Sequence, residues 1–375
     1  MKKILFTFGT RPEAIKMAPV IKAFKTEEAE IRVCVTAQHR TMLDQVLEFF
    51  EIEADYDLNL MKPGQDLFSL TSAIILGMKP VLEDFKPDFV FVHGDTTTSF
   101  AASLACFYAQ VKVCHVEAGL RTFDKFSPFP EEMNRVLTGR IADIHFAPTK
   151  QSKLNLLEEK VPEQNIIVTG NTVIDALLTS VNLAGRENNV EITKLKTLIA
   201  AEKKIILVTG HRRENFGDGF LNICKALKQI ADNNQDVQII YPVHLNPNVQ
   251  KPVFDLLKDT PNITLIDPLA YESFIWLMNE SYLIITDSGG VQEEAPSLGK
   301  PVLVMRDTTE RPEAVTAGTV LLVGTDAEVI VREAQLLISD ESAYKKMSEL
   351  HNPYGDGCAS KRIVDFILND IRNEY

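Results

Sequence analysis

The 375-residue sequence lacks the features that mark secreted, membrane-spanning and nucleic-acid-binding proteins. Its five cysteines include no CxxC pair and leave an odd one over, so we expect a reduced, cytoplasmic protein. No apolar run approaches the roughly 18 to 20 residues that a membrane-spanning helix needs. No segment is rich in lysine or arginine and the net charge is −13, which argues against the basic face that binds nucleic acid.

Two signatures of bound cofactors are missing as well. The pattern Gly-x-Gly-x-x-Gly, typical of dinucleotide-binding folds, is absent, and no histidines and carboxylates have the helical i, i+4 spacing of metal ligands. We therefore expect neither a cofactor nor a metal. The first apolar run, Ile4–Phe8, ends after five residues, which is too short for a signal peptide and predicts a strand.

Short runs rich in β-branched residues alternate with longer amphipathic stretches throughout the chain. The runs predict strands at Lys3–Phe8, Ile31–Thr36, Asp88–His93, Val111–Val116, Ile166–Thr169, Lys204–Thr209, Val237–Tyr241, Ile263–Ile266, Tyr282–Thr286 and Pro301–Met305. Such alternation favours parallel sheets covered by helices, and the length suggests two domains. Two consecutive predicted helices, 172–183 and 191–201, interrupt the pattern.

The fold predicted from this pattern is α/β, with two Rossmann-like doubly wound domains facing each other across a cleft. We place the N-terminal domain at residues 1–170 and the C-terminal domain at residues 171–359. A final amphipathic helix, 360–373, is expected to pack back on the first domain. Ligands in such folds bind beyond the carboxyl ends of the strands, so the residues just after each strand are the ones to examine.

Three of these segments are suited to binding an anion. After the first strand, Arg11 and Lys16 place two cations beside a helix start. In the second half, Ser288, Gly289 and Gly290 begin a helix with exposed N–H groups and a hydroxyl, and Glu294 lies one turn later, where it could accept from ribose hydroxyls. Arg311 precedes a proline in a later segment. The alternative is a set of ordinary strand-to-helix turns and N-caps with solvated charges.

Three carboxylates form a candidate acid–base set. Asp95 and Glu117 each follow one of two strands expected to be adjacent, and Glu131 follows Pro130. Their mutual repulsion would raise at least one pKa, as proton transfer to and from carbon requires. The alternative is helix capping, with Asp95 as an N-cap and Glu131 as an anion in a first helical turn.

The histidines differ in their surroundings. His211 follows a strand together with Arg212, and this setting suits a departing diphosphate that gains charge. His244 has a weaker functional signal. His93 and His115 lie in or beside apolar strands and are interpreted as core residues, as is Trp276 on an apolar helix face.

Taken together, these segments resemble the bacterial non-hydrolysing UDP-N-acetylglucosamine 2-epimerase family. The matching segments are Gly9–Ala14, His93–Thr98, His115–Thr122, Pro130–Arg135, Gly210–Asn215 and Asp287–Gly299. The resemblance covers nearly the whole chain. It implies a glycosyltransferase-B-like fold, a homodimer, and interconversion of UDP-GlcNAc and UDP-ManNAc for surface polysaccharide synthesis.

The resemblance also implies roles for individual residues. Asp95, Glu117 and Glu131 become the acid–base carboxylates, and His211 contacts the diphosphate. The matching nucleotide-sugar contacts are Arg11, Lys16, Phe274, Ser288, Gly289, Gly290, Glu294 and Arg311. One position departs from the family, because Leu269 replaces a glutamine that precedes the Phe274 motif in some members.

A second departure concerns regulation. Some members of the family are activated by a second UDP-GlcNAc molecule, through residues that resemble Gln38, His39, Arg212 and His244. Two polar positions of that set are Thr41 and Gly64 in this chain. Allosteric activation is therefore a hypothesis, which strictly hyperbolic kinetics would contradict.

The residues fit a route that needs no NAD. In this route UDP leaves C1 while a carboxylate removes the C2 proton, which gives 2-acetamidoglucal, and UDP then adds back after protonation of the opposite face. Which carboxylate acts as base is left open. The rival functions are a hydrolysing epimerase that releases ManNAc, a glycosyltransferase-B-type UDP-sugar transferase, and a non-catalytic UDP-sugar-binding module.

Overall fold

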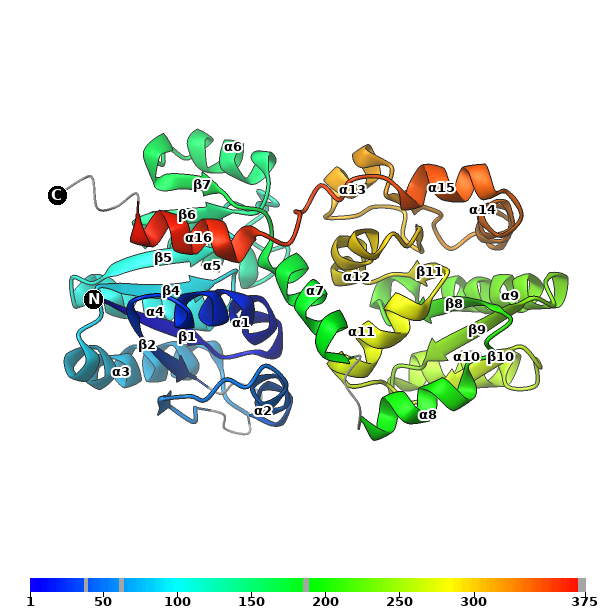
Figure 1. Ribbon diagram of the computed structural model, residues 1–375, viewed down its shortest axis with the longest axis horizontal. Coiled ribbons are helices and arrows are strands. Elements are labelled where there is room, and N and C mark those ends of the chain that lie inside the picture. The colour runs from blue at the N-terminus through cyan, green and yellow to red at the C-terminus, as the bar shows by residue number, and fades with distance from the viewer. Residues whose placement is uncertain (37–39, 61–63, 185–188, 370–375) are drawn as a thin grey trace. The chain divides into compact units, whose positions relative to one another are not determined.

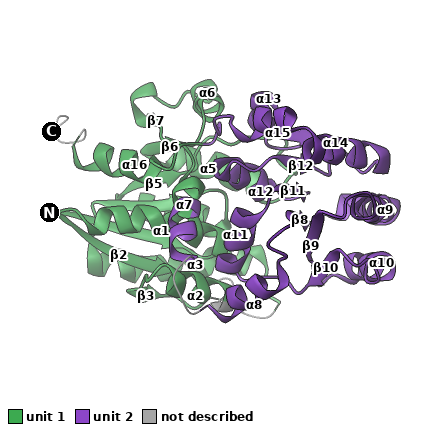
Figure 2. Cartoon of the chain, turned by 45° about the vertical axis from the view of Figure 1, so that its right-hand side comes forward, with its two compact units in different colours: residues 1–176, 355–375 green, residues 177–354 purple. Residues whose placement is uncertain are grey.

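Two compact units make up the chain. The computed structural model describes residues 1–36, 40–60, 64–184 and 189–369 (Figure 1). Unit 1 comprises residues 1–176 and 355–375, and unit 2 comprises residues 177–354 (Figure 2). Each unit contains one parallel β-sheet with helices against it, so the α/β class is confirmed. Within the described ranges, no helix is both long and apolar enough to cross a membrane.

The sheet of unit 1 has the order β3-β2-β1-β4-β5-β6-β7. Its strands are β1 (Lys2–Phe8), β2 (Ala29–Val35), β3 (Tyr56–Asp57), β4 (Phe89–His93), β5 (Lys112–Val116), β6 (Ile144–Ala147) and β7 (Ile166–Val168). β4 and β5 pair in parallel, as the sequence predicted. The chain winds outward in one direction to β3 and in the other to β7, so the strand order reverses between β1 and β4. This reversal is where open α/β sheets bind ligands.

The helices of unit 1 bury apolar faces against this sheet. They are α1 (Arg11–Lys25), α2 (Arg40–Phe49), α3 (Leu67–Phe85), α4 (Thr97–Tyr108), α5 (Glu131–Ile141), α6 (Lys150–Glu158), the start of α7 (Thr172–Ala184) and α16 (Ala359–Leu368). α16 lies beside α1 (Figure 1) and buries Ile363, Val364 and Ile367. Residues 370–373 of the predicted final helix lie outside the described residues.

Unit 2 repeats the doubly wound plan with the strand order β10-β9-β8-β11-β12-β13. Its strands are β8 (Lys204–Thr209), β9 (Val237–Pro242), β10 (Ile263–Ile266), β11 (Leu283–Thr286), β12 (Val302–Val304) and β13 (Val320–Leu322). The helices are the rest of α7, α8 (Val190–Leu198), α9 (Asp218–Asn233), α10 (Pro247–Leu257), α11 (Tyr271–Glu280), α12 (Gly289–Glu294), α13 (Pro312–Ala317), α14 (Ala327–Ser339) and α15 (Glu341–Ser348). The order reverses between β8 and β11, so the segments that follow these two strands form the expected ligand edge.

Candidate functional site

Asp95 lies in the turn between β4 and α4, and its carboxylate does not cap the helix. Gly94 takes a left-handed φ of 64° there, and Thr96 rather than Asp95 caps α4, accepting a hydrogen bond from Ser99 N at 3.1 Å. The capping interpretation of Asp95 is therefore wrong. The Asp95 side chain instead pairs with Arg135 of α5 at 2.6 Å.

Glu117 occupies the corresponding place after β5 and is held from several sides. Its side chain is 9% exposed and forms an ion pair with Lys16 of α1. Asn171 donates to the same carboxylate oxygen at 3.0 Å, and His93 Nε2 lies 3.8 Å from it. A Cβ on Gly94 would lie 3.7 Å from the other oxygen of Glu117, so the two strand ends approach each other closely. Two of the three predicted carboxylates thus share one edge of the sheet.

The pKa of Asp95 is raised above its ordinary value, as expected. Burial is the largest cause, the ion pair with Arg135 opposes it, and the nearby Glu117 charge adds to the rise. Repulsion between the carboxylates is therefore a contributor and not the main cause. A raised pKa keeps Asp95 closer to the range in which a carboxyl group can both give and take a proton.

Glu131 occupies the first position of α5, directly after Pro130. Its Oε2 is buried and has no hydrogen-bond partner among the described residues. Three residues later, Asn134 donates to the backbone carbonyl of Asp95 at 2.9 Å, so the first turn of α5 is attached to the segment that carries Asp95. The sequence prediction of a first-turn anion is correct for its position.

Unit 2 brings two guanidinium groups to the glycines at the start of α12. A Cβ on Gly289 would lie 3.7 Å from an Arg212 nitrogen and 3.8 Å from the Arg311 guanidinium carbon, so both guanidinium groups lie beside this glycine. Ser288 is the N-cap residue of α12 but makes no side-chain capping bond. The glycines, the hydroxyl and both cations thus lie together in an arrangement suited to phosphate oxygens.

His211 lies at the end of β8, beside the same helix start. Its Nδ1 is 3.5 Å from the buried Asp287 carboxylate, and its ring stacks on that of His244 with centroids 5.5 Å apart. Burial lowers the pKa of His211, with His244 and Arg212 acting in the same direction and Asp287 opposing them. His211, Arg212 and His244 are therefore one cluster.

Fewer observed contacts link the remaining predicted residues to these clusters. Arg11 is exposed at the first position of α1, five residues before Lys16. Phe274 is partly buried on α11, which packs near β8 and residues 295–298. Glu294 Oε1 would lie 3.9 Å from a Cβ on Gly290, so it folds over the start of α12. Gln38 and His39 lie outside the described residues. Among the residues that the structure describes, no group of three histidine, cysteine or acidic side chains could hold a metal ion.

Sequence reasoning did not assign a role to Glu13, whose carboxylate links the segment after β1 to the N-cap residue of α4. Its buried carboxylate accepts from Gly9 N at 3.1 Å, Thr10 N at 2.8 Å and Thr96 Oγ1 at 2.7 Å. Thr10 and Glu13 have the spacing of a capping box, so a search for that pattern would have found Glu13. Arg135 and Asn171 were also missed, because their partners are distant in sequence.

Comparisons with known proteins identify close relatives. The model of the family described as UDP-N-acetylglucosamine 2-epimerase matches residues 22–368. The UDP-N-acetylglucosamine 2-epimerase of Escherichia coli K12 is 59% identical over 98% of this chain and 99% of its own length. A crystal structure of the Neisseria meningitidis enzyme bound to UDP-GlcNAc is 54% identical, covers 98% of this chain and 99% of its own, and has a TM-score of 0.87. A structure of a putative epimerase from Listeria monocytogenes is 48% identical over 99% of this chain and 97% of its own, with a TM-score of 0.93.

Proposed function

The chain belongs to the UDP-N-acetylglucosamine 2-epimerase family, and from this premise we propose that it interconverts UDP-GlcNAc and UDP-ManNAc. Its fold is glycosyltransferase-B-like, with two parallel α/β sheets. The observation that carries the proposal is the pair of partly shielded carboxylates, Asp95 and Glu117, at adjacent strand ends. A protein that only bound a UDP-sugar would not need this pair.

The two units divide the reaction between them in this proposal. Unit 2 binds the UDP moiety through Ser288, Gly289, Gly290, Arg311 and His211, because N–H groups and cations stabilise the charge on a departing diphosphate. Glu294 and Phe274 complete the nucleotide contacts of unit 2, and the family resemblance assigns nucleotide-sugar contacts to Arg11 and Lys16 as well.

Unit 1 supplies the proton transfers. A carboxylate takes the C2 proton, the C–H electron pair forms the C1=C2 double bond, and UDP leaves with the electron pair of the C1–O bond. Protonation of C2 on the other face and return of UDP to C1 then give the epimer. Two faces require more than one acid–base group, which Asp95, Glu117 and Glu131 provide.

Turnover of UDP-GlcNAc in D2O, followed by NMR, tests this proposal. We expect UDP-ManNAc to form and deuterium to appear at C2 of both UDP-sugars, because the abstracted proton exchanges with solvent. Retention of protium at C2 in the product would contradict the elimination route. Accumulation of free ManNAc would instead identify a hydrolysing epimerase, and absence of turnover without an acceptor would favour a transferase or a binding module.

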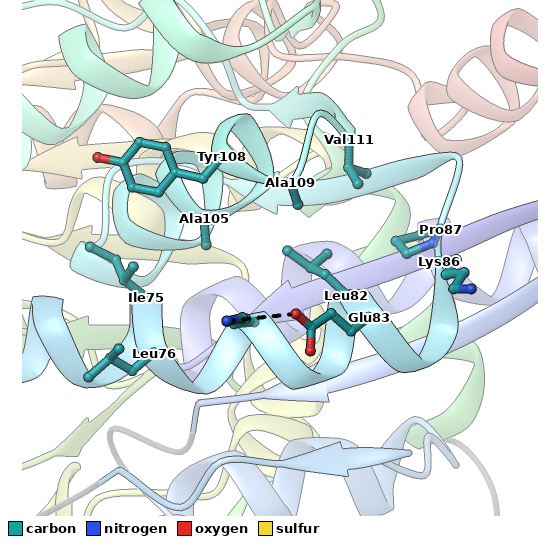
Figure 3. A pocket seen from close by; sticks show the side chains of 11 residues that line it. Ile75, Leu76, Leu82, Glu83, Lys86, Pro87, Ala105, Tyr108, Ala109 and Val111 are labelled. Carbon is teal, nitrogen blue, oxygen red and sulfur yellow. Dashed lines mark ion pairs between the residues drawn. The ribbon is translucent and has the colours of Figure 1, made fainter.

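We also propose that the chain forms a homodimer through the exposed face of α3 and α4. An open groove of about 510 Å³ runs between these helices, lined by Ile75, Leu76 and Leu82 of α3 and by Ala105 and Tyr108 of α4 (Figure 3). Leu76 is 72% exposed and Tyr108 67% exposed. A contiguous exposed apolar patch is unusual on a monomer.

The size and charge of this face fit a second copy of the chain. The aromatic residues Phe68, Phe107 and Tyr108 are 85%, 63% and 67% exposed, so at roughly 200 Å² for each ring side chain they would contribute on the order of 400 Å², about half of the roughly 800 Å² that a standard interface takes from each partner. Lys79 and Glu83 form an ion pair at the groove, 3.8 Å apart. In a two-fold dimer, Lys79 of one copy can meet Glu83 of the other, so the face is complementary to itself.

Replacing Leu76 with glutamate should disrupt this dimer. In analytical ultracentrifugation we expect the unmodified protein to sediment at twice the 42.0 kDa of one chain, and Leu76→Glu to shift towards a single chain at micromolar concentrations. Leu154→Glu is the matched control, because Leu154 is also an exposed leucine on a helix of unit 1 but lies on α6. A monomeric unmodified protein, or an unchanged dimer in Leu76→Glu, would contradict the assignment of this face.

A further inference from the structure

Asp287 is a fully buried carboxylate between the two anion-binding segments of unit 2. It follows the last residue of β11 and directly precedes Ser288 and the glycines of α12. Its backbone N–H donates to the carbonyl of Thr209 at 3.2 Å, which joins β11 to the end of β8. The side chain is 0% exposed. A carboxyl group so far from water needs polar partners, because removing its hydration is costly.

One oxygen of this carboxylate organises the backbone of the turn after β8. Asp287 Oδ2 accepts from the N–H groups of His211 and Arg212, both at 2.9 Å, and from the side-chain amide of Asn215 at 3.3 Å. These three bonds fix the path of the chain from residue 211 to residue 215. They also place the Arg212 side chain on the side of Gly289.

The other oxygen faces the His211 ring. Asp287 Oδ1 has no hydrogen-bond partner among the described residues. It lies 3.5 Å from His211 Nδ1. An Nδ1–H on the ring would satisfy this buried oxygen with a small rotation. The ring then carries its proton on Nδ1 when neutral, and Nε2 is the nitrogen that gains a proton on charging.

We propose that Asp287 is a positioning residue that fixes the His211 ring with Nδ1–H towards its carboxylate and so reserves Nε2 for the diphosphate of UDP. This inference rests on the proposed function for the identity of the diphosphate, but the orientation of the ring does not. Asp287 touches neither UDP nor the reacting carbons in this scheme. It acts through His211 and, through the backbone bonds, through Arg212.

Three charged or titratable groups face the His211 ring, and each affects its protonation. Asp287 lies at the end of β11 and favours the charged ring. Arg212 in the same turn and His244 after β9 disfavour it. His244 Nδ1 accepts the N–H of Asn246 at 3.1 Å, so a proton on a neutral His244 resides on Nε2. Asp287 is therefore the one carboxylate that stabilises a protonated His211 within this set.

The Asp287→Asn substitution tests whether the Asp287 side chain orients the His211 ring or only fills space. The amide oxygen can still accept from the N–H groups of His211 and Arg212, so the turn should survive. The amide NH2 would then face His211 Nδ1 and donate to it, which moves the ring proton of the neutral form to Nε2. Histidine-selective 15N NMR distinguishes the two tautomers, and the His211 signals are assigned by their loss in His211→Gln.

We expect His211 in the unmodified protein to be the Nδ1–H tautomer when neutral, and to become the Nε2–H tautomer in Asp287→Asn. An Nε2–H tautomer in the unmodified protein would overturn the proposal without any variant being needed. An unchanged tautomer in a folded Asp287→Asn would overturn it as well.

Kinetics give the second measurement. We expect kcat/KM of Asp287→Asn to fall by about tenfold, because the neutral ring still donates from Nε2 but lacks the positive charge that strengthens the bond to the diphosphate, and we expect its pH profile to shift to lower pH because the protonated ring is less stable. The matched control is Asp255→Asn, the same substitution at an α10 position exposed to solvent. A normal pH profile in Asp287→Asn would contradict the proposal. Lack of epimerisation by the unmodified protein would instead contradict the proposed function, and the NMR result would still decide the ring orientation.

Discussion

Substituting Glu117 with glutamine is expected to lower kcat by about 10² to 10⁴-fold and to change KM much less. General acid–base catalysis contributes an effect of that size, and the glutamine amide keeps the size of the side chain while removing its basicity. In the structure this carboxylate is shielded from water and shared between Lys16 and Asn171. Rates of UDP-GlcNAc turnover at saturating substrate, with C2 deuterium exchange measured in parallel, check the expectation.

A matched control is available in the same unit. Glu163 also pairs with a lysine, Lys153 at 2.8 Å, but its side chain is exposed at the surface. We expect Glu163→Gln to retain full activity. If Glu117→Gln kept both turnover and deuterium exchange near the unmodified level, Glu117 would not be an acid–base residue. If exchange persisted while net epimerisation stopped, Glu117 would serve only one of the two faces of C2.

The sequence predicted the strand ends well and the contacts between side chains poorly. The runs before Asp95 and Glu117 are rich in β-branched and aromatic residues, so β4 and β5 were identified with bounds close to those observed, and their adjacency follows from the doubly wound order. β6 and β13, with four and three residues, were not predicted from the sequence, although β7 and β12, with three residues each, were. β3 has two residues and offers no pattern.

The missed contacts share a physical cause. Asp95 and Arg135 are 40 positions apart, and Glu117 and Asn171 are 54 positions apart. Neither pair leaves a local pattern, since their meeting depends on how β5, α5 and α7 are arranged around the sheet. By contrast, the capping-box pair Thr10 and Glu13 is local and readable.

The capping of α4 shows a further limit. Aspartate and threonine are both good N-caps, so composition alone does not decide between Asp95 and Thr96. The left-handed turn at Gly94 decides it, because it starts α4 one residue later and leaves Asp95 to pair with Arg135. A functional carboxylate and a structural one can therefore have the same local sequence.

Unit 1 is expected to unfold in mild acid before unit 2, because it buries three neutral histidines. Burial lowers the pKa of His93 to about 4, of His115 to about 3 and of His145 to about 4. Above pH 6.5 these rings are neutral in both the folded and the unfolded chain and have no effect on stability. Below pH 6.5 only the unfolded chain takes up the protons, so the free energy of unfolding falls until the folded pKa values are reached.

The expected loss of unfolding free energy in acid is large compared with the total stability of a domain. Each ring contributes about 1.4 kcal/mol per pH unit, so three rings give roughly 4 kcal/mol per unit between about pH 6 and pH 4.5. A whole domain has only about 5 to 15 kcal/mol. Burial raises the pKa values of Glu13, Asp95 and Asp175, and their earlier protonation in the folded state offsets part of the loss at the acid end.

Two optical signals can separate the units in an acid titration. Trp276 is the single tryptophan and lies in unit 2, so its fluorescence reports on that unit, whereas far-UV circular dichroism reports on both. We expect a partial loss of the dichroism signal at a higher pH than the fluorescence change. His145→Gln should flatten the dependence of unfolding free energy on pH by about 1.4 kcal/mol per unit, and His351→Gln, at an exposed position of unit 2, should leave it unchanged. Coincident transitions, or an unchanged slope in His145→Gln, would mean that the buried histidines do not set the acid stability of unit 1.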